Sequence, residues 1–419
     1  MHLPKDYPHS LNQLYHPTSK YGQDNQNLVY VSDILNNTKF TPILLKEWFY
    51  LLKKNGYLII DYYPNHLCDW QKLEELMWWL WKGKYDIKFH SPITQKEVKG
   101  NSNSNLLKFI KSLDNLDQSI TCKNIDSSKP IIRFICQKTV STLIPNDNIN
   151  SWTFGIITNG KRPELIKDII RSIRCQNIPN YQIIICGNYL YNKKDKDILH
   201  IPFNNRDDLG WITKKKNIIV KQSKYQNLCL LHDRITLGKN WYHGIKKWGN
   251  CFEIILGKTS FQNNEQNLDF VCIDGLNSIN IKEMNFFKYL PTGNLQIEDW
   301  SQDLIAYSAN FIVKKNILTK NPFNESLYWK KFEDLEISQE NNKKGYLVRI
   351  NPKAIFHIKE KTKAFTFTYF SFNDQKIGRL NNENLVLKTM LKLLYFFKIS
   401  RDNKIIKIFC DRFSKYTKR

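Results

Sequence analysis

The sequence lacks three features that would each point to another class of protein. No uninterrupted apolar stretch is long enough to cross a bilayer. The first residues, MHLPKDYPHS, contain no apolar core of the kind that a signal peptide needs. The cysteines are scattered and none forms a C-x-x-C pair, which argues against a zinc site. We therefore expect a soluble, cytoplasmic protein whose thiols are reduced and mostly buried.

Acidic residues are too few to balance the basic ones. There are 63 Lys and Arg against 39 Asp and Glu, a formal net charge of +24. Such an excess can serve nucleic acid, an anionic membrane surface or a phosphorylated ligand. The basic residues are spread along the chain rather than clustered, so nucleic-acid binding is disfavoured. The 419 residues and a hydrophobic content of 42% suit two or three folded domains.

The first region, about residues 1–145, has the pattern of a smaller α/β domain. The segments NLVYVSD and YLIIDYY predict buried strands, and IIRFICQK predicts another. Between the first two, TPILLKEWFYLLKKNG predicts a helix that Thr41 caps, Pro42 begins and Gly56 ends. A strand, helix, strand series with short links favours a parallel sheet.

Part of this region resembles a class I, Rossmann-like methyltransferase. The matching residues are Ser32, Asp33, Leu35, Leu52, Lys53, Gly56 and Leu58. The methyl-donor pocket of that family begins with a glycine-rich turn, whereas Gly22 is the only glycine here before Gly56. We therefore interpret the region as a truncated, incomplete Rossmann-like domain that serves as a remnant or a docking module.

The last region, about residues 372–419, is basic and predicted to be helical. Its segment LVLKTMLKLLYFFK is strongly apolar but punctuated by lysines. Packing against its own domain is the preferred interpretation, and peripheral contact with a membrane surface is the alternative.

The second region, about residues 151–371, contains the candidate chemistry. It opens with a strand that ends at Thr158, followed by a loop and by a helix that begins at Pro163. The next strand, YQIIICGN, ends near Asn188. Ligands of open α/β sheets bind at the carboxyl ends of strands, so Thr158, Asn159 and Asn188 are expected at the mouth of a cleft.

Basic residues follow at a helix start and at a strand end. The segment KKKN, residues 214–217, falls in the first turns of a helix, where positive side chains are unfavourable unless an anion lies there. The strand LCLL then emerges at His232, Asp233 and Arg234. An Asp at that edge can hold a divalent cation, and His or Arg beside it can bind phosphate or the metal. A salt-bridged strand end is the alternative.

Two adjacent carboxylates, Glu333 and Asp334, are predicted at a helix start, and Gly345 is predicted to end that helix. Carboxylates at a helix N-terminus are stabilised as anions, which leaves a base able to take a proton from a hydroxyl. A capping acid pair is the alternative. A strand YLVRI and a second strand containing His357 are predicted to follow.

The order of these segments resembles that of the GT-A glycosyltransferases, in particular the inverting family-2 type. The matching positions are Arg162–Leu165, Gly210, Lys216, Asn217, Leu231, Asp233, Ser308–Asn316, Glu333, Asp334, Glu336, Gly345 and His357. The resemblance implies a Rossmann-like, mostly parallel sheet. It also implies transfer of a sugar, with inversion, from a nucleotide-sugar to a hydroxyl of a glycan, lipid or protein. A catalytically inactive nucleotide-sugar or glycan-binding module of the same fold is the alternative.

The resemblance also assigns roles to individual residues. The nucleotide pocket would be lined by Thr158, Asn159 and Asn188, with Arg162, Lys216 and Arg234 on the donor side. Asp334 would deprotonate the acceptor hydroxyl with support from Glu333. Asp233 and His357 would hold Mg²⁺ or Mn²⁺ on the two phosphates. Acids of the family's metal motif are replaced here by His232 and Arg234. His232 is therefore an alternative metal ligand, and Arg234 is an alternative source of positive charge without a metal.

Overall fold

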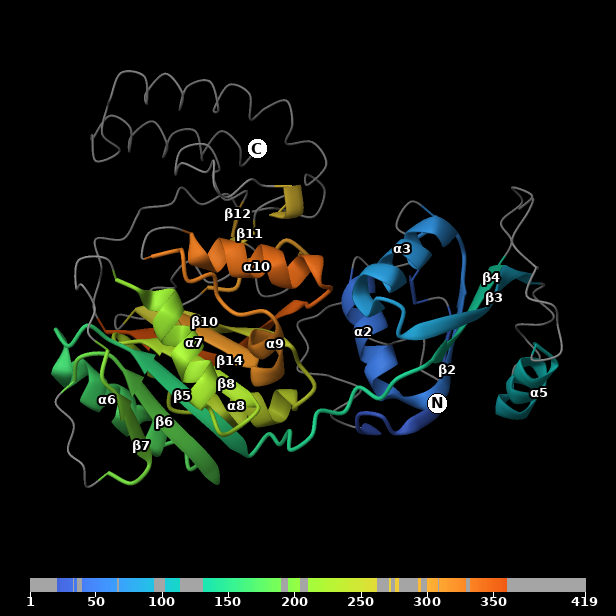
Figure 1. Ribbon diagram of the computed structural model, residues 1–419. Coiled ribbons are helices and arrows are strands. Elements are labelled where there is room, and N and C mark those ends of the chain that lie inside the picture. The colour runs from blue at the N-terminus through green and yellow to red at the C-terminus, as the bar shows by residue number, and fades with distance from the viewer. Residues whose placement is uncertain are drawn as a thin grey trace, which may run out of the picture. The chain divides into compact units, whose positions relative to one another are not determined.

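The computed structural model describes residues 21–32, 34–35, 40–65, 68–93, 102–113, 131–189, 195–203, 210–261, 271–272, 276–278, 293–294, 300–307, 309–328 and 332–359. They form two compact α/β units (Figure 1). Unit 1 comprises Met1–Ser151, Gly244–Glu253 and Lys343–Leu347, and unit 2 comprises Trp152–His243, Ile254–Asn342 and Val348–Arg419. The predicted α/β class is confirmed. The predicted tail at 372–419 lies outside the described residues, as do Asp33 and Ser308.

Unit 1 contains a four-stranded sheet in the order β1-β2-β4-β3. Its strands are β1 (Gln26–Ser32), β2 (Leu52–Tyr62), β3 (Tyr85–Ile93) and β4 (Ile131–Lys138), and its helices are α2 (Thr41–Leu51), α3 (Trp70–Trp81) and α5 (Asn103–Leu113). Strands β1 and β2 run parallel and are joined by α2, which confirms the predicted strand, helix, strand series. Strand β4 is antiparallel to both β2 and β3.

The sheet of unit 1 is covered on both faces. Alternate residues of its strands point to one face, and on that face α5 packs in a core cluster made of Leu28, Tyr30, Ile59, Leu106, Ile110 and Ile135. Figure 1 shows α2 and α3 on the other side of the same sheet. The period-2 pattern of the strands thus provides two apolar faces, each with its own helical layer.

The predicted ends of helix α2 are wrong. Thr41 is the first helical residue and does not cap the helix, because Phe40 occupies the N-cap without a side-chain hydrogen bond. The helix ends at Leu51, since Leu52 is already extended (ψ 138°) and begins β2. Gly56 lies within β2, beside an irregularity in the pairing with β1. Pairing with β1 therefore makes the residues after Leu51 extended, although their side chains alone would have allowed another turn of helix.

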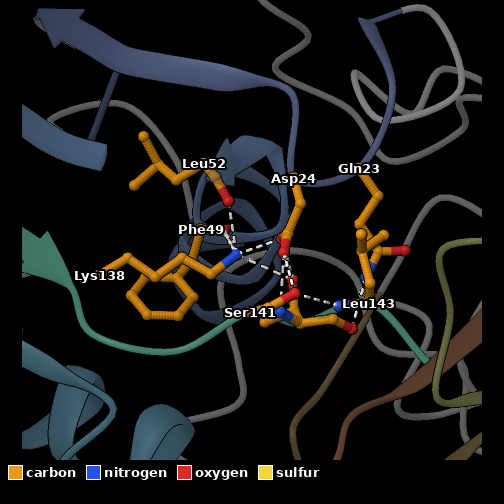
Figure 2. A network of polar contacts seen from close by, with 8 residues as sticks. Gln23, Asp24, Phe49, Leu52, Lys138, Ser141 and Leu143 are labelled. Carbon is orange, nitrogen blue, oxygen red and sulfur yellow. Dashed lines mark hydrogen bonds and ion pairs between the residues drawn. The ribbon is translucent and has the colours of Figure 1, made fainter. Parts of the chain in front are cut away.

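Unit 1 buries Lys138 completely, and Figure 2 shows the network around its amine. The Nζ atom donates to the carboxylate of Asp24, to Thr142 Oγ1 at 2.8 Å and to the carbonyls of Phe49, at 3.0 Å, and Leu52. Asp24 also accepts from the backbone N–H of Thr142 at 3.0 Å. A buried ammonium is tolerated when its protons are used in this way.

Two more buried ion pairs of unit 1 are hydrogen-bonded at both partners. Arg133 donates twice to Asp61, at 2.7 Å each, and Tyr30 Oη donates to the same carboxylate at 2.9 Å. Glu253 accepts from Lys46 Nζ at 2.6 Å and Tyr50 Oη at 2.8 Å, and from the backbone N–H of Leu347 at 2.7 Å. The Glu253 carboxylate thus joins three segments that are remote in sequence.

Unit 2 is built on an eight-stranded sheet in the order β7-β6-β5-β8-β13-β10-β14-β9. Its strands are β5 (Ser151–Ile157), β6 (Asn180–Cys186), β7 (Ile198–Ile201), β8 (Asn227–His232), β9 (Ile235–Leu237), β10 (Ile254–Phe261), β13 (Asn310–Lys314) and β14 (Val348–Ile358). The pairs β5–β8, β6–β7 and β10–β14 are parallel. Strand β13 runs antiparallel to β8 and β10, and β9 runs antiparallel to β14. Strands β11 (Val271–Cys272) and β12 (Gly293–Asn294) pair separately.

Three helices of unit 2 lie where the sequence predicts them: α6 (Pro163–Arg174), α7 (Ile212–Gln222) and α10 (Glu333–Lys343). The structure adds α9 (Lys315–Lys320), the short 3-10 helix η2 (Leu276–Ser278) and α8 (Trp241–Trp248), which continues into the segment of unit 1 that begins at Gly244. In Figure 1, α7 lies across one face of the large sheet. Among the described residues, no helix combines the length and apolar character needed to cross a membrane.

The two strands predicted after α10 are a single strand, β14. Its register against β10 jumps between Gly257 and Thr259, whose partners are Asn351 and Phe356. This irregularity absorbs the turn-like residues around Pro352, so that His357 lies in the same strand as Val348. The seven described cysteines are free, and all but Cys175 are buried, as expected.

Candidate functional site

The carboxyl ends of β5 and β8 bring Thr158 and Asp233 together. The strands are parallel and place Ile157 opposite His232, so the residues that follow each strand are neighbours. Thr158 Oγ1 donates to Asp233 Oδ2 at 2.8 Å and accepts from the backbone N–H of Gly160 at 3.0 Å. The predicted convergence of these strand ends is therefore present.

The loops after β5 and β6 pack backbone against backbone. Gly187 has φ +139°, and a Cβ there would collide with the carbonyl of Thr158. Gly160 has φ +83°, and a Cβ there would collide with the carbonyl of Asn188. An acidic side chain at position 187 would not fit this approach. The side chain of Asn159 accepts from the N–H of Lys161 at 3.1 Å, and Asn188 is exposed.

Both carboxylate oxygens of Asp233 have protein partners. Oδ2 accepts from Thr158, and Oδ1 lies 3.3 Å from Nη1 of Arg162, the residue before helix α6. Asp233 is buried, whereas the side chain of Arg162 is 30% exposed. The ion pair therefore holds a guanidinium at the edge of the site, with further N–H groups directed elsewhere.

The predicted metal ligands do not form a ready cation site. His357 lies opposite Thr236 of β9, three residues beyond Asp233, and its Nδ1 is 2.8 Å from Ser260 Oγ. Among the described residues, no three or more His, Cys, Asp or Glu side chains gather in a group that could hold a metal ion. Asp233 is bonded to Thr158 and Arg162, and His357 Nδ1 lies beside Ser260 Oγ. The Mg²⁺ or Mn²⁺ site stays a prediction.

His232 lies in a cationic environment. The pKa of His232 is held well below its ordinary value, and burial is the largest cause. The positive charges of Lys216, Arg234, Lys215 and Arg162 act in the same direction. The ring is therefore neutral at physiological pH. Its Nε2 and the Nε of Arg234 are buried and find no hydrogen-bond partner within the described ranges. Four cations around one neutral ring favour an anionic ligand over a metal ion.

Helix α7 contributes two buried lysines in succession. Lys215 Nζ donates to the carbonyl of Thr158 at 2.6 Å. Lys216 points elsewhere: its Nζ is 3.9 Å from Glu333 Oε1, and its side chain is 0% exposed. The sequence predicts that Lys216 faces the donor phosphates, whereas its amine lies beside the carboxylate of Glu333. Asn217 binds the backbone N–H and carbonyl of Phe323, at 3.0 and 2.8 Å, which is a structural role.

The carboxylate pair lies at the start of α10, as predicted. Phe332, the residue before it, has a left-handed φ of 58° and turns the chain into the helix. Glu333 is buried and Asp334 is partly exposed. Burial, and next the negative charge of Glu333, raise the pKa of Asp334 to about 7, although Lys216 acts in the opposite direction. A carboxyl with this pKa is suited to proton transfer near neutral pH.

Tyr307 links the carboxylates to the cations. Burial is the largest cause that raises its pKa, and the charges of Asp334 and Glu333 act in the same direction. A hydrogen bond and a positive charge from Arg234 act to lower it. Tyr307 therefore feels both Arg234 at the end of β8 and the acid pair at the start of α10, which belong to one site.

No family model and no curated protein matches the chain. Among solved structures, it is similar to TarS 1–349 of S. aureus, with TM-score 0.32 and 12% identity over 50% of this chain and 60% of that one. It is also similar to S. aureus TarS, with TM-score 0.33 and 11% identity over 50% and 37%. For TarS 1–349 in complex with UDP, the values are 0.34 and 12% over 60% and 73%. The matched part thus spans less than two thirds of the first two, and likeness this weak carries no argument about function.

The structure thus gathers most of the predicted site residues of unit 2. Those connected to one another by the contacts and charges above are Thr158, Arg162, Lys216, His232, Asp233, Arg234, Glu333 and Asp334. His357 lies on β14, opposite Thr236 of β9. Asn159 and Asn188 make contacts within the loops that follow β5 and β6. Sequence reasoning missed Lys215 and Tyr307. The run of three lysines was the only signal for Lys215, and nothing in the sequence marked Tyr307.

Proposed function

We propose that this chain transfers a sugar from a nucleotide-sugar to a hydroxyl acceptor. The single observation that supports it best is the meeting of a cationic cluster with a carboxylate pair. The cluster consists of Arg162, Lys215, Lys216 and Arg234, and all four charges act on His232. The pair is Glu333 and Asp334 at the start of α10.

The two arginines of the cationic cluster suit a diphosphate. Arg162 and Arg234 emerge at the carboxyl ends of parallel strands, where α/β sheets bind ligands. Guanidinium groups pair with phosphate oxygens through two parallel hydrogen bonds. When the bond between the anomeric carbon and the diphosphate breaks, negative charge grows on the leaving oxygen, and cations already in place stabilise it.

The carboxylate pair suits the other half of the reaction. Asp334 accepts the proton of the acceptor hydroxyl as its oxygen attacks the anomeric carbon from the face opposite the diphosphate. One carbon–oxygen bond forms and one breaks, the proton resides on Asp334, and the nucleoside diphosphate leaves with the electron pair. This assignment predicts inversion of the anomeric centre. Asp334 is favoured over Glu333 because it is the more exposed of the two.

A divalent cation is not required by this scheme. If Mg²⁺ or Mn²⁺ binds, Asp233 and His357 are the residues proposed to hold it, and its role is to neutralise phosphate charge. Activity that survives chelation leaves that role to Arg162 and Arg234. Activity that chelation removes and Mn²⁺ restores supports the metal.

A panel of nucleotide-sugars tests the proposal most directly. The full-length protein is heated with each nucleoside diphosphate and each nucleotide-sugar, with and without Mn²⁺. A true donor at about 100 times its Kd stabilises the fold by about 2.7 kcal/mol. The donors that stabilise are then incubated with glycan, lipid and peptide acceptors, and released nucleoside diphosphate and glycosylated product are measured.

Two outcomes contradict the proposal. If no nucleotide-sugar shifts the unfolding transition, the cationic cluster does not bind a diphosphate donor. If donors bind but neither hydrolysis nor transfer follows with any acceptor, the chain is a nucleotide-sugar-binding module without turnover.

A further inference from the structure

Lys216 is a buried cation whose hydrogen bonds are unused. Its side chain is fully buried, and its Nζ finds no hydrogen-bond partner in the part of the chain that the structure describes. A buried ammonium without hydrogen bonds is unfavourable unless an opposite charge offsets its desolvation. The burial of Lys216 is therefore locally unfavourable, and the groups around its amine indicate what role the residue has.

The neighbours of Lys216 Nζ are an aromatic ring and the acid pair. The ring of Phe323 lies 4.9 Å away, and Glu333 Oε1 lies 3.9 Å away. Its charge is felt by Asp334 as well as by Glu333. Lys215, one residue earlier on α7, instead donates to Thr158 beside Asp233. The two lysines thus contact different parts of the site. Lys215 contacts the end of β5, and Lys216 lies beside the start of α10.

We propose that Lys216 is a positioning residue for the general base, whose ammonium pairs with Glu333 and keeps the neighbouring Asp334 ionised. It does not contact the donor phosphates. This inference rests on the proposed function for its consequence in catalysis, but the electrostatic coupling that it asserts exists whether or not a sugar is transferred.

The groups that act on Asp334 can be named for each neighbouring element. Glu333 on α10 raises the pKa of Asp334, and Lys216 on α7 lowers it. Tyr307, in the segment before β13, interacts with Asp334 and is itself bonded to Arg234. Lys216 is the cation among these that acts directly on the base, so its removal takes that positive charge away from Asp334. The pKa of Asp334 must then rise further.

The test compares Lys216→Met with Lys216→Arg in the full-length enzyme. An opposite charge within about 4–6 Å lowers a carboxyl pKa by about 1–3 units, so Lys216→Met should move the acidic limb of kcat/KM upward by about one pH unit or more. The KM for the donor should change less than about threefold. Lys216→Arg, which keeps the charge, should return the limb towards its wild-type position. A limb that stays in place while the donor KM rises tenfold or more identifies Lys216 as a phosphate contact and overturns the inference.

A second readout does not depend on turnover. Carboxyl ¹³C NMR of protein labelled at aspartate gives the titration midpoint of Asp334, with the resonance assigned by its loss in Asp334→Asn. The midpoint should be higher in Lys216→Met than in the wild type, and an unchanged midpoint refutes the coupling. If Lys216→Met does not fold, Lys216→Gln gives the same comparison. If the wild type is inactive with every donor, and the Asp334 midpoint is still higher in Lys216→Met than in the wild type, the proposed function is refuted and this inference stands.

Discussion

Lys138 of unit 1 and Lys216 of unit 2 are both completely buried, and their surroundings differ sharply. Lys138 Nζ lies within hydrogen-bond distance of four acceptors, including one carboxylate (Figure 2). Lys216 Nζ has a carboxylate oxygen at 3.9 Å and no hydrogen bond to any described residue. The first arrangement stabilises a fold, and the second keeps a charge in place for another group. Burial alone therefore does not distinguish a structural ion from a functional one, whereas the use of its hydrogen bonds does.

The same contrast extends to the other buried charges. Arg133 of unit 1 gives two hydrogen bonds of 2.7 Å to Asp61. In unit 2, Arg234 Nε and His232 Nε2 are buried without a hydrogen-bond partner among the residues described. Buried polar atoms without a hydrogen-bond partner are rare in folded proteins and need an explanation. An anionic ligand that completes these hydrogen bonds is such an explanation, and the following changes test it.

The largest expected effect is on turnover. Asp334→Asn removes the proposed base while keeping the size of the side chain, and should lower kcat by about 10²- to 10⁴-fold. Glu340→Gln, further along the same helix, is the matched control and should leave kcat near the wild-type value. Steady-state release of nucleoside diphosphate in the presence of acceptor measures both. Full activity in Asp334→Asn would remove the acid pair from the mechanism.

The next effect is on stability and separates the two buried lysines directly. Lys138→Met leaves the Asp24 carboxylate buried without its cation, and should lower the free energy of unfolding by about 3–5 kcal/mol. Lys216→Met removes an amine that makes no hydrogen bond to any described residue and pairs with Glu333 only at 3.9 Å, so the free energy of unfolding should fall less than in Lys138→Met. Urea unfolding followed by fluorescence measures the difference. Equal losses in the two variants would break the contrast on which the functional assignment of Lys216 depends.

The pH dependence of the wild type tests the environment of Asp334. Its pKa in the folded protein, about 7, is raised above the ordinary 3.8. The base form is therefore lost as pH falls through about 7, and kcat/KM should drop about tenfold for each further pH unit. The stability of the fold changes with pH in the opposite direction to activity. The protonated carboxyl favours the folded state, and this contribution to the free energy of unfolding is lost as pH rises through about 7. Relative to Asp334→Asn, the wild type should thus lose stability between about pH 4 and pH 8.

The smallest effect concerns donor binding. Arg162→Lys loses the planar guanidinium and its contact with Asp233, and should raise the donor KM about tenfold with little change in kcat. Arg171→Lys is a matched control because Arg171 lies on the exposed face of α6, where its side chain is 73% exposed. An unchanged donor KM in Arg162→Lys would place the diphosphate away from the start of α6.

The sequence predicts the local elements of the site because each has a strong pattern of its own. Pro163 with the buried isoleucines after it predicts α6, and the acid pair predicts the start of α10. The apolar runs before Thr158 and His232 predict two buried strands. Side-chain type and spacing suffice here, since neighbours in sequence decide these structures.

Contacts between remote segments could not be predicted in the same way. Nothing in the run of three lysines indicates that Lys215 reaches Thr158 whereas Lys216 reaches Glu333. The early end of α2 is decided by pairing between β1 and β2 rather than by helix propensity. The close approach of Gly187 to Thr158 depends on two loops of the folded sheet. These features arise from tertiary packing, which overrides local preference.

The Glu253 carboxylate has a consequence for biosynthesis. Its partners Lys46 and Tyr50 leave the ribosome some two hundred residues before it, and Leu347 follows almost a hundred residues later. Until Glu253 is synthesised, Lys46 on α2 lacks this buried carboxylate. The contacts of unit 1 are therefore completed only after Leu347 has been synthesised, and a fragment that stops at Ser151 should be more prone to proteolysis than the same residues within the full-length chain.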